Sequence, residues 1–305
     1  MKISLSAFLT PNEIALLSGS SHAGKSTLAL QYIQGCVEGR EEVLGLPCTP
    51  PGSKWGYIKS DRKPSDLENL ADRLHFDLSS IPLICVPTDL AISHTRVEVD
   101  APGLLRDLCL QLKQHGCTHV AVDTFSVFIG ANLNHYNQVA AKLIYLNRIC
   151  DELSITLLGI HHTGKARTDF SFMRPQDAVS GSMALQGYTS TQLTLTAPEE
   201  LKKDATPQTP SRLMVRSHIA KPATVWLKRD AAGLFKESTA EVAIAEAGAA
   251  GEDILSLFSN GERLTVQDIV ERSKASRATV FRKLQILEEA CAIYKAGRGL
   301  YERMH

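Results

Sequence analysis

Residues 19–27 combine glycine, lysine and hydroxyl side chains in the pattern G-x-x-x-x-G-K-[ST], which is typical of a phosphate-binding loop. The loop consists of Gly19, Ser20, Ser21, His22, Ala23, Gly24, Lys25, Ser26 and Thr27. An apolar run precedes it at 14–17 and a helical pattern begins at Leu28, so both flanks that the motif requires are present. Lys25 would neutralise phosphate oxygens, and the Ser26 hydroxyl would bind Mg²⁺. A chance match in a Gly/Ser loop is the alternative, but the two correct flanks favour a site for ATP with Mg²⁺.

Two aspartates follow predicted strands and could do chemistry beside the phosphates. Asp123 ends the apolar strand 119–123, where a carboxylate would hold Mg²⁺ directly or through water. Asp61 ends the strand 55–60, where a carboxylate could orient the attacking water. Both have plainer interpretations, because aspartate is common at strand ends: Asp123 as a turn or helix cap, and Asp61 as an Asx turn before Pro64.

The pair His161-His162 follows the next apolar strand, 155–160. Adjacent strand residues point to opposite faces, so the two imidazoles cannot easily share one metal ion. We expect one imidazole to face the phosphates as a hydrogen-bonding sensor and the other to pack in the sheet. An ordinary core or surface histidine is the alternative for either residue.

These residues must be positioned by elements that alternate between strand and helix patterns from residue 14 to about residue 196. The expected strands are 14–17, 55–60, 81–86, 119–123 and 155–160, and the expected helices follow Leu28 and span 67–74, 102–115 and 139–153. Such alternation predicts an α/β fold with a mostly parallel sheet and helices on both faces. Ligands bind at the carboxyl ends of parallel strands. Gly19, Asp61, Asp123 and His162 should therefore meet in one crevice.

The overall composition has no charge excess, because Lys plus Arg and Asp plus Glu both number 33 in 305 residues. Contacts with nucleic acid must therefore come from local patches. Seven cysteines are scattered without a C-x-x-C pair, which argues against a zinc site or a disulfide framework and fits a reducing cytoplasm. The sequence has neither the features of a signal peptide nor an apolar run of about 18 residues, so we expect a cytoplasmic protein without a membrane span.

The motifs and their order resemble those of RecA-like ATPases, and among these the RepA-type hexameric replicative helicases of plasmids and their phage-encoded relatives. The resemblance covers about residues 10–235 and rests on the phosphate loop, Tyr57 to Asp61 followed by Lys63-Pro-Ser, Val120 to Thr124, His161 to Lys165, and Ser180-Gly-Ser. It implies that Lys25 and Ser26 bind phosphate and Mg²⁺. It also implies that Asp123 is the second acidic group and His162 the sensor at the γ-phosphate. Asp61 stands where the family has its catalytic glutamate, and the shorter side chain could slow turnover because water positioning is sensitive to such displacement.

Helicases of this family carry an arginine after the Ser180-Gly-Ser segment that reaches the phosphate of the neighbouring subunit, so the resemblance implies a homo-oligomeric ring, which we expect to be a hexamer. Counting forward from that segment reaches Ser190-Thr191, a stretch with no basic residue. Three basic residues that follow could substitute, namely Arg212, Arg216 and Lys221. We assign this catalytic role to Arg216, with ordinary strand surface charges as the alternative. Loss of such a finger would favour a weak ATPase switch over a processive motor.

The stretch 163–180 carries cations and aromatic rings without clear periodicity. They are Lys165, Arg167, Arg174, Phe170 and Phe172. In a RecA-like ring this loop faces the central channel, where cations follow the phosphates of a single DNA strand and aromatic rings stack on bases. A surface loop with ordinary charges is the alternative.

The composition changes after the ATPase domain, which we place at 1–235. Residues 236–250 are rich in Ala, Glu and Gly and predict a linker. Residues 251–305 carry apolar spacings for three helices, followed by a hairpin-like turn. This order resembles a winged helix-turn-helix domain.

The recognition helix of that domain would begin at Arg277, with Ser276 as its N-cap. The residues expected to contact duplex DNA are Lys274, Arg277, Arg282, Lys283 and Arg298. Many winged helices bind proteins instead, so a protein partner stays open as the alternative.

The sequence therefore predicts an ATP-hydrolysing, DNA-binding protein, with two main hypotheses for its role. The first is a ring-forming replicative helicase or translocase of a mobile element, which the motif order favours. The second is an ATP-gated DNA-binding regulator or recombination accessory with weak ATPase activity, which Asp61 and Ser190 favour. A nucleotide-binding interaction module without a DNA role is a third hypothesis, which the two basic segments disfavour.

Overall fold

The computed structural model describes most of the chain. The described residues are 8–60, 64–86, 101–129, 135–162, 183–198, 210–219, 222–238, 252–258, 262–289, 293–297 and 299–303.

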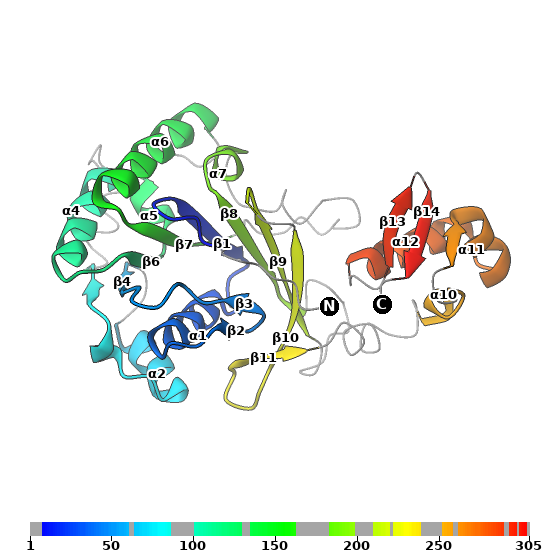
Figure 1. The fold of residues 1–305 in the computed structure, drawn as a ribbon, viewed down its shortest axis with the longest axis horizontal. Helices are drawn as coiled ribbons and strands as arrows, with labels where there is room; N and C mark the ends of the chain where they lie inside the picture. The colour runs from blue at the N-terminus through cyan, green and yellow to red at the C-terminus, as the bar shows by residue number, and fades with distance from the viewer. Residues whose placement is uncertain are drawn as a thin grey trace.

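A nine-stranded sheet forms the centre of the larger part of the molecule (Figure 1), with the order β11-β10-β9-β8-β1-β7-β6-β4-β5. Six of its strands are mutually parallel: β1 (Ile14–Gly19), β4 (Trp55–Lys59), β5 (Leu83–Cys85), β6 (His119–Asp123), β7 (Thr156–His162) and β8 (Thr191–Thr196). The predicted α/β class and parallel sheet are confirmed. Because the strands run in one direction, the ends of β1, β4, β6 and β7 lie along one edge of the sheet.

Three further strands extend the sheet beyond β8 in antiparallel fashion. They are β9 (Ser211–Ser217), β10 (Ala223–Arg229) and β11 (Phe235–Ser238). Residues 236–238, which the sequence analysis assigned to the linker, are therefore part of this sheet. The polar run Lys-Glu-Ser gives no strand signal of its own, and pairing with β10 decides its conformation.

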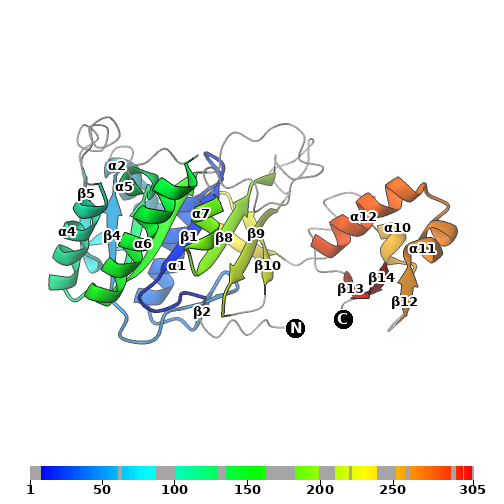
Figure 2. The same cartoon turned by 90° about the horizontal axis from the view of Figure 1, so that it is seen from above.

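Helices cover both faces of the sheet, as Figure 2 shows from above. They are α1 (Lys25–Val37), α2 (Pro64–Leu74), a 3₁₀ turn (Leu78–Ser80), α4 (Ala101–Gln114), α5 (Ser126–Ile129), α6 (Tyr136–Leu153) and α7 (Met183–Gly187), and the short strands β2 (Glu42–Val43) and β3 (Leu46–Pro47) form a separate hairpin. Strand β1 alternates between the two faces: Ala15 and Leu17 pack in a core with α1 and α2, while Ile14 and Leu16 pack in a second core with α4, α5 and α6. The sheet is thus buried on both sides, which explains the continuous apolar runs of its central strands.

The C-terminal residues form a third core of their own. Its elements are α10 (Glu252–Leu255), β12 (Arg263–Thr265), α11 (Val266–Ser273), α12 (Arg277–Glu289), β13 (Ile293–Gly297) and β14 (Leu300–Arg303), with a sheet in the order β12-β14-β13. The three predicted helices and the hairpin are present, and β12 is an additional strand. Helix α11 starts with a capping box between Thr265 and Asp268, and Ser276 Oγ accepts a hydrogen bond from Thr279 N at the start of α12.

Within the described part of the chain, no helix is long and apolar enough to cross a membrane.

His119, at the start of β6, is a polar group within the packed end of the sheet. Its ring lies 5.1 Å from that of Trp55, and its Nδ1 is 2.9 Å from Thr118 Oγ1. Burial lowers the pKa of His119 from 6.5 to about 4, because the protonated form loses its hydration. The native state therefore binds fewer protons than the unfolded state between these two pH values.

We expect the free energy of unfolding to be highest above pH 6.5 and to fall as the pH drops toward 4, with His119 contributing up to about 3 kcal/mol of the change. Urea unfolding at pH 7 and pH 4.5 measures it. His119→Gln should flatten the pH dependence, whereas His115→Gln, at an exposed position, should not. An identical pH dependence in His119→Gln and the wild type would contradict this assignment.

Candidate functional site

The phosphate loop leaves β1 at Gly19 and enters α1 at Lys25. Gly24 has a φ of 98°, and a Cβ there would lie 2.5 Å from Arg229 Nη2. A Cβ on Gly19 would lie 2.5 Å from the carbonyl oxygen of Leu195 on β8. Both glycines of the motif are therefore required by backbone geometry and by close packing.

Lys25 folds back over its own loop, and its side chain is buried. Its Nζ donates to the carbonyl oxygens of Gly19 at 3.0 Å and Ser20 at 2.7 Å, and it lies 3.2 Å from His162 Nδ1. His161, the preceding residue of β7, is buried in the sheet. The two imidazoles thus point to opposite faces, as the strand geometry predicts, and His162 is the one beside the loop.

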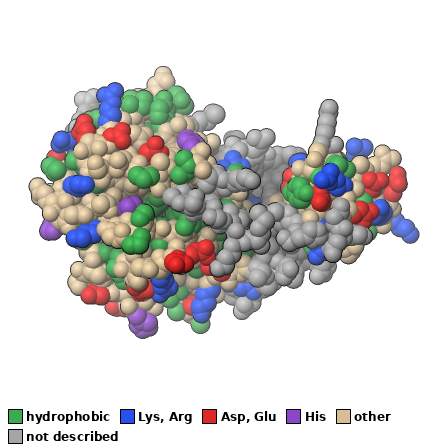
Figure 3. All heavy atoms as spheres, viewed as in Figure 1, with side chains coloured by type: hydrophobic (Ala, Val, Ile, Leu, Met, Phe, Trp, Pro, Cys, Tyr) green, Lys and Arg blue, Asp and Glu red, His purple; other side chains and the backbone are tan. Residues whose placement is uncertain are grey.

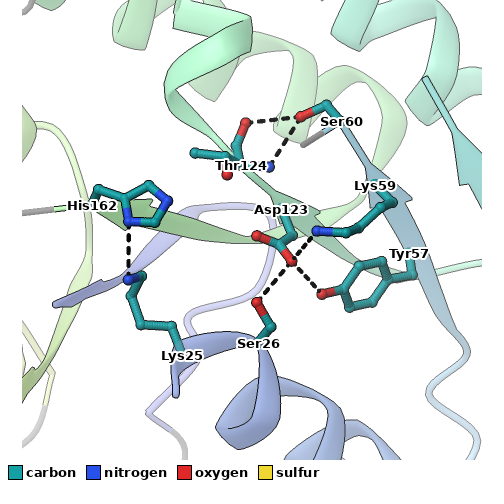
Figure 4. A network of polar contacts seen from close by, with 8 residues as sticks. All are labelled: Lys25, Ser26, Tyr57, Lys59, Ser60, Asp123, Thr124 and His162. Atoms are coloured by element: carbon teal, nitrogen blue, oxygen red, sulfur yellow. Dashed lines mark hydrogen bonds and ion pairs between the residues drawn. The ribbon is translucent and has the colours of Figure 1, made fainter. Parts of the chain in front are cut away.

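Asp123 lies at the centre of a buried polar network at the ends of β4 and β6 (Figure 4). Its Oδ2 accepts hydrogen bonds from Ser26 Oγ at 2.9 Å, Tyr57 OH at 3.0 Å and Lys59 Nζ at 2.9 Å. Lys59 is equally buried, so the two charges form an ion pair shielded from solvent. The network joins α1, β4 and β6 through one carboxylate oxygen.

A second contact fixes the same two strand ends to each other. Ser60 Oγ accepts a hydrogen bond from Thr124 N at 3.0 Å and donates to Thr124 O at 3.2 Å, and Ser60 N donates to Asp123 O at 2.7 Å. Asp61, the next residue, lies outside the described residues. The position from which its side chain departs is therefore set by Ser60.

The hairpin between β10 and β11 returns to the phosphate loop from the far end of the sheet. Arg229 Nη2 donates to the carbonyl oxygens of His22 at 3.0 Å and Ala23 at 2.6 Å, and its guanidinium lies 5.1 Å from the ring centre of Phe235. His22 has a φ of 67°, and its carbonyl is held in this orientation by Arg229. The hairpin therefore stabilises the conformation of a loop about 200 residues earlier in the chain.

These groups enclose a pocket of about 280 Å³. Its described lining residues are His22, Gly24, Lys25, Ser26, Thr27, Arg73, Asp123, His162, Arg229 and Gly233. Three of them carry a positive charge and one, Asp123, a negative charge. Such a surplus of donors and cations around a glycine-rich loop suits a polyphosphate.

The pocket also fits a hard divalent cation. Ser26 gives its proton to Asp123, so its two lone pairs remain for a metal ion, and the carboxylate stands next to it. Hydroxyl and carboxylate oxygens are the ligands that Mg²⁺ prefers. The donor set is consistent with Mg²⁺ bound by Ser26 and, directly or through water, by Asp123.

A larger cavity of about 380 Å³ lies at the opposite ends of the strands, beside Asn12, His119 and Thr156. Its titratable lining groups include Tyr32, Cys48 and His119. Burial raises the pKa of Tyr32 and raises that of Cys48 to about 12, and it lowers the pKa of His119 to about 4. All three groups are neutral at pH 7, so they offer no charge to a phosphate.

The structure brings four predicted residues together, namely Lys25, Ser26, Asp123 and His162. Arg216 lies elsewhere: it is exposed on β9, opposite Gln192, and is absent from the described lining of the pocket. Arg212, its alternative, is buried and cannot be a surface charge. Lys165, Arg167, Arg174 and Arg298 lie outside the described residues, as does the side chain of Arg282.

Several site residues were not predicted from the sequence. Lys59 and Tyr57 carry a signal in hindsight, because a polar side chain at every second position of an otherwise apolar strand marks one face. Arg73 and Arg229 carry none, since only the packing of α2 and of the β10–β11 hairpin places them at the pocket.

A parallel sheet with this loop at the end of its central strand, a carboxylate on the neighbouring strand end and helices on both faces defines a RecA-like P-loop ATPase. The sequence matches a family model described as an AAA domain over residues 5–168, more than half of the chain, and the protein belongs to this family.

Two solved structures have a similar fold. The KaiC-like protein PH0186 from the hyperthermophilic archaeon Pyrococcus horikoshii OT3 aligns with a TM-score of 0.51 and 13% identity, covering 75% of this chain and 91% of that one. The second structure, an ATPase domain, aligns with a TM-score of 0.53 and 13% identity, covering 73% of this chain and 84% of that one. No curated protein matches the sequence.

Replacing Arg229 tests the contribution of the β10–β11 hairpin to the pocket. Arg229→Ala should weaken the binding of a fluorescent ADP analogue by about tenfold, because it removes both a pocket charge and the two hydrogen bonds that hold the loop. Arg40→Ala is the matched control, since Arg40 is exposed and pairs with Glu38. Equal affinities for the two variants would show that the hairpin does not support the site.

Proposed function

We propose that this protein binds and hydrolyses ATP with Mg²⁺, binds DNA and assembles into a ring, as a replicative helicase or translocase of the RepA type from a mobile element. The observation that carries the nucleotide part is the convergence of Lys25, Ser26, Asp123 and His162 on one pocket.

The chemistry of each residue follows from its position. Lys25, Arg73 and Arg229 would neutralise the phosphates, and the loop N–H groups would donate to their oxygens. Ser26 and Asp123 would hold Mg²⁺, which supplies charge stabilisation for phosphoryl transfer when bound. His162, 3.2 Å from Lys25 Nζ, is placed to contact the terminal phosphate.

Asp61 is proposed as the group that orients the attacking water. Support comes from its neighbour Ser60, which is fixed to Thr124 beside Asp123. The next residue of the chain therefore begins close to the metal-binding carboxylate. Aspartate is one methylene shorter than the glutamate of the family, which favours slow turnover.

Arg216 is proposed to act on the nucleotide of a neighbouring subunit. It is exposed, and its register partner Gln192 lies near the start of β8, whereas the phosphate loop lies level with the end of that strand. Its side chain thus lies away from the site of its own subunit. A ring, proposed here as a hexamer, would bring it to a neighbour's phosphates.

The C-terminal domain is proposed to be a winged helix that binds duplex DNA. Helix α12 begins with exposed Arg277, has no acidic residue in its first turn and follows exposed Lys274. The exposed ring of Phe281 lies 5.8 Å from the Arg277 guanidinium, which places an aromatic surface beside a cation. Ion pairs neutralise Arg263 with Glu302 and Arg272 with Glu262 on the neighbouring elements.

This sorting of charge within the domain matters because the protein has no global charge excess. On the face drawn in Figure 3, Lys and Arg are interspersed with Asp and Glu. DNA contact through α12, with Lys283 in its second turn, is therefore proposed as a local interaction.

A second function, an ATP-gated DNA-binding regulator with weak ATPase activity, is favoured by one observation. The positions reached by counting to the family's finger, Ser190 and Thr191, are buried, and Ser190 Oγ donates to Ile14 O inside the sheet. A residue at this place cannot contact a neighbouring subunit without rearrangement of β8.

Steady-state ATP hydrolysis without DNA, with single strands and with duplex discriminates between the two functions. We expect Lys25→Ala to lose at least about tenfold in nucleotide affinity or turnover, because the phosphates lose their cation. Strong stimulation by single-stranded DNA would indicate a motor, and a slow rate indifferent to DNA would indicate the regulator. Hydrolysis that is unchanged in Lys25→Ala would refute the assignment of the site.

The DNA-binding surface is tested by the double variant Arg277→Ala/Arg282→Ala. Duplex affinity should fall, and the slope of log K against log salt should become shallower by about 2, one unit for each lost phosphate contact. Arg263→Ala/Arg272→Ala is the matched control, because these cations are paired with acids. If affinity and slope match the control, the domain binds a protein partner.

A further inference from the structure

Lys59 is a buried cation at the metal-binding end of the phosphate pocket. It is 4% exposed, and its Nζ lies 2.9 Å from Asp123 Oδ2. The two residues are direct register partners on the parallel strands β4 and β6. Their side chains therefore leave the same face of the sheet at the same level.

The same strand also places Tyr57 on this oxygen. Tyr57 and Lys59 are two positions apart on β4, so both point to the face that carries Asp123. With Ser26, three donors share Oδ2. The carboxylate is thus held in one orientation by neighbours from two elements.

Burial of an ammonium and a carboxylate removes hydration from both, and the loss is offset only when the pair is closely matched and hydrogen-bonded. An uncharged pair of similar volume would pack the strands equally well without that cost. The position of this pair is informative, because its acidic member is the residue that suits Mg²⁺. Lys59 neutralises that member before any metal ion arrives.

The charge balance of the pocket leads in the same direction. Its described lining carries the cations Lys25, Arg73 and Arg229 and the single anion Asp123. Lys59 cancels that anion, so the surplus of positive charge faces the phosphates undiminished. Such a pocket is complementary to a nucleotide polyphosphate that carries no metal ion.

We propose that Lys59 is a built-in counter-ion of Asp123, so that this site binds nucleotide polyphosphate with little help from a divalent cation and holds that cation weakly. The inference rests on the proposed nucleotide site and concerns how that site is regulated by metal. Lys59 acts through Asp123 as a positioning residue. Removal of its charge makes the site more attractive to a divalent cation and more repulsive to metal-free phosphates.

The test uses the full chain and two measurements on ADP complexes. The first is the affinity of a fluorescent ADP analogue with Mg²⁺ and with excess EDTA. The second is the affinity of Mn²⁺ for the ADP complex, followed by electron paramagnetic resonance. The variant is Lys59→Met, which keeps the length of the side chain, and the control is Lys54→Met, at an exposed position just before β4.

For the wild type and Lys54→Met, we expect EDTA to weaken ADP binding by less than about threefold. In Lys59→Met, EDTA should weaken it by about tenfold or more, and Mn²⁺ should bind the ADP complex about tenfold more tightly than in the wild type. A purely structural role of Lys59 would move neither ratio. Equal EDTA responses and equal Mn²⁺ affinities in Lys59→Met and wild type would overturn the proposal.

The wild type provides a test that does not depend on folding of the variant. A loss of ADP affinity of about 100-fold in EDTA would overturn the proposal even if Lys59→Met failed to fold. A wild type that binds no ADP under either condition would instead refute the nucleotide site, and the inference with it. Failure of the inference alone leaves wild-type ADP binding intact, so the two failures are distinguishable.

Discussion

The site depends on one carboxylate oxygen, Oδ2 of Asp123. It accepts from Ser26 at the start of α1, from Tyr57 and Lys59 on β4, and it belongs to β6. A single oxygen therefore fixes the helix that carries the phosphate loop relative to two neighbouring strands. A shift of β4 by one residue would turn Lys59 and Tyr57 to the opposite face and leave a buried charge without a partner. The register of the sheet and the electrostatics of the pocket are thus the same constraint.

The sheet brings this constraint to the phosphate loop because its six parallel strands end along one edge. Both of its faces are covered, so the strand ends are supported by two apolar cores. The antiparallel extension adds a contribution from the far side: β10 carries Arg229 back to the carbonyls of the loop. The loop is therefore held from within by Lys25 and from outside by Arg229, and it needs no large rearrangement to receive a polyphosphate.

The same architecture separates the chemistry from the proposed DNA contacts. The pocket groups come from the large sheet, whereas the cations of α12 belong to a domain with its own core. Coupling between them would pass through the antiparallel strands, because Arg229 of β10 contacts the phosphate loop, Phe235 of β11 contacts α1, and β11 directly precedes the chain that leads to the C-terminal domain. The buried position of Ser190 and the neutralised Asp123 both fit a site that responds slowly and acts as a switch. The order of the motifs fits a ring-forming motor, so the balance between the two functions depends on the contacts between subunits.

The sequence alone determined the phosphate loop, the alternation of strands and helices, and the C-terminal arrangement of helices and hairpin. These are local patterns: glycine spacing, apolar periodicity and capping residues act over a few positions. It also indicated that Asp123 and His162 end strands beside the loop, because parallel strands share an edge. Only the tertiary structure decided that Lys59 neutralises Asp123, that Arg212 is buried while Arg216 is exposed, and that Arg229 lies on the phosphate loop. Those facts depend on strand order and register between segments as far as about 200 residues apart, and no local pattern in a chain specifies which distant strands become neighbours.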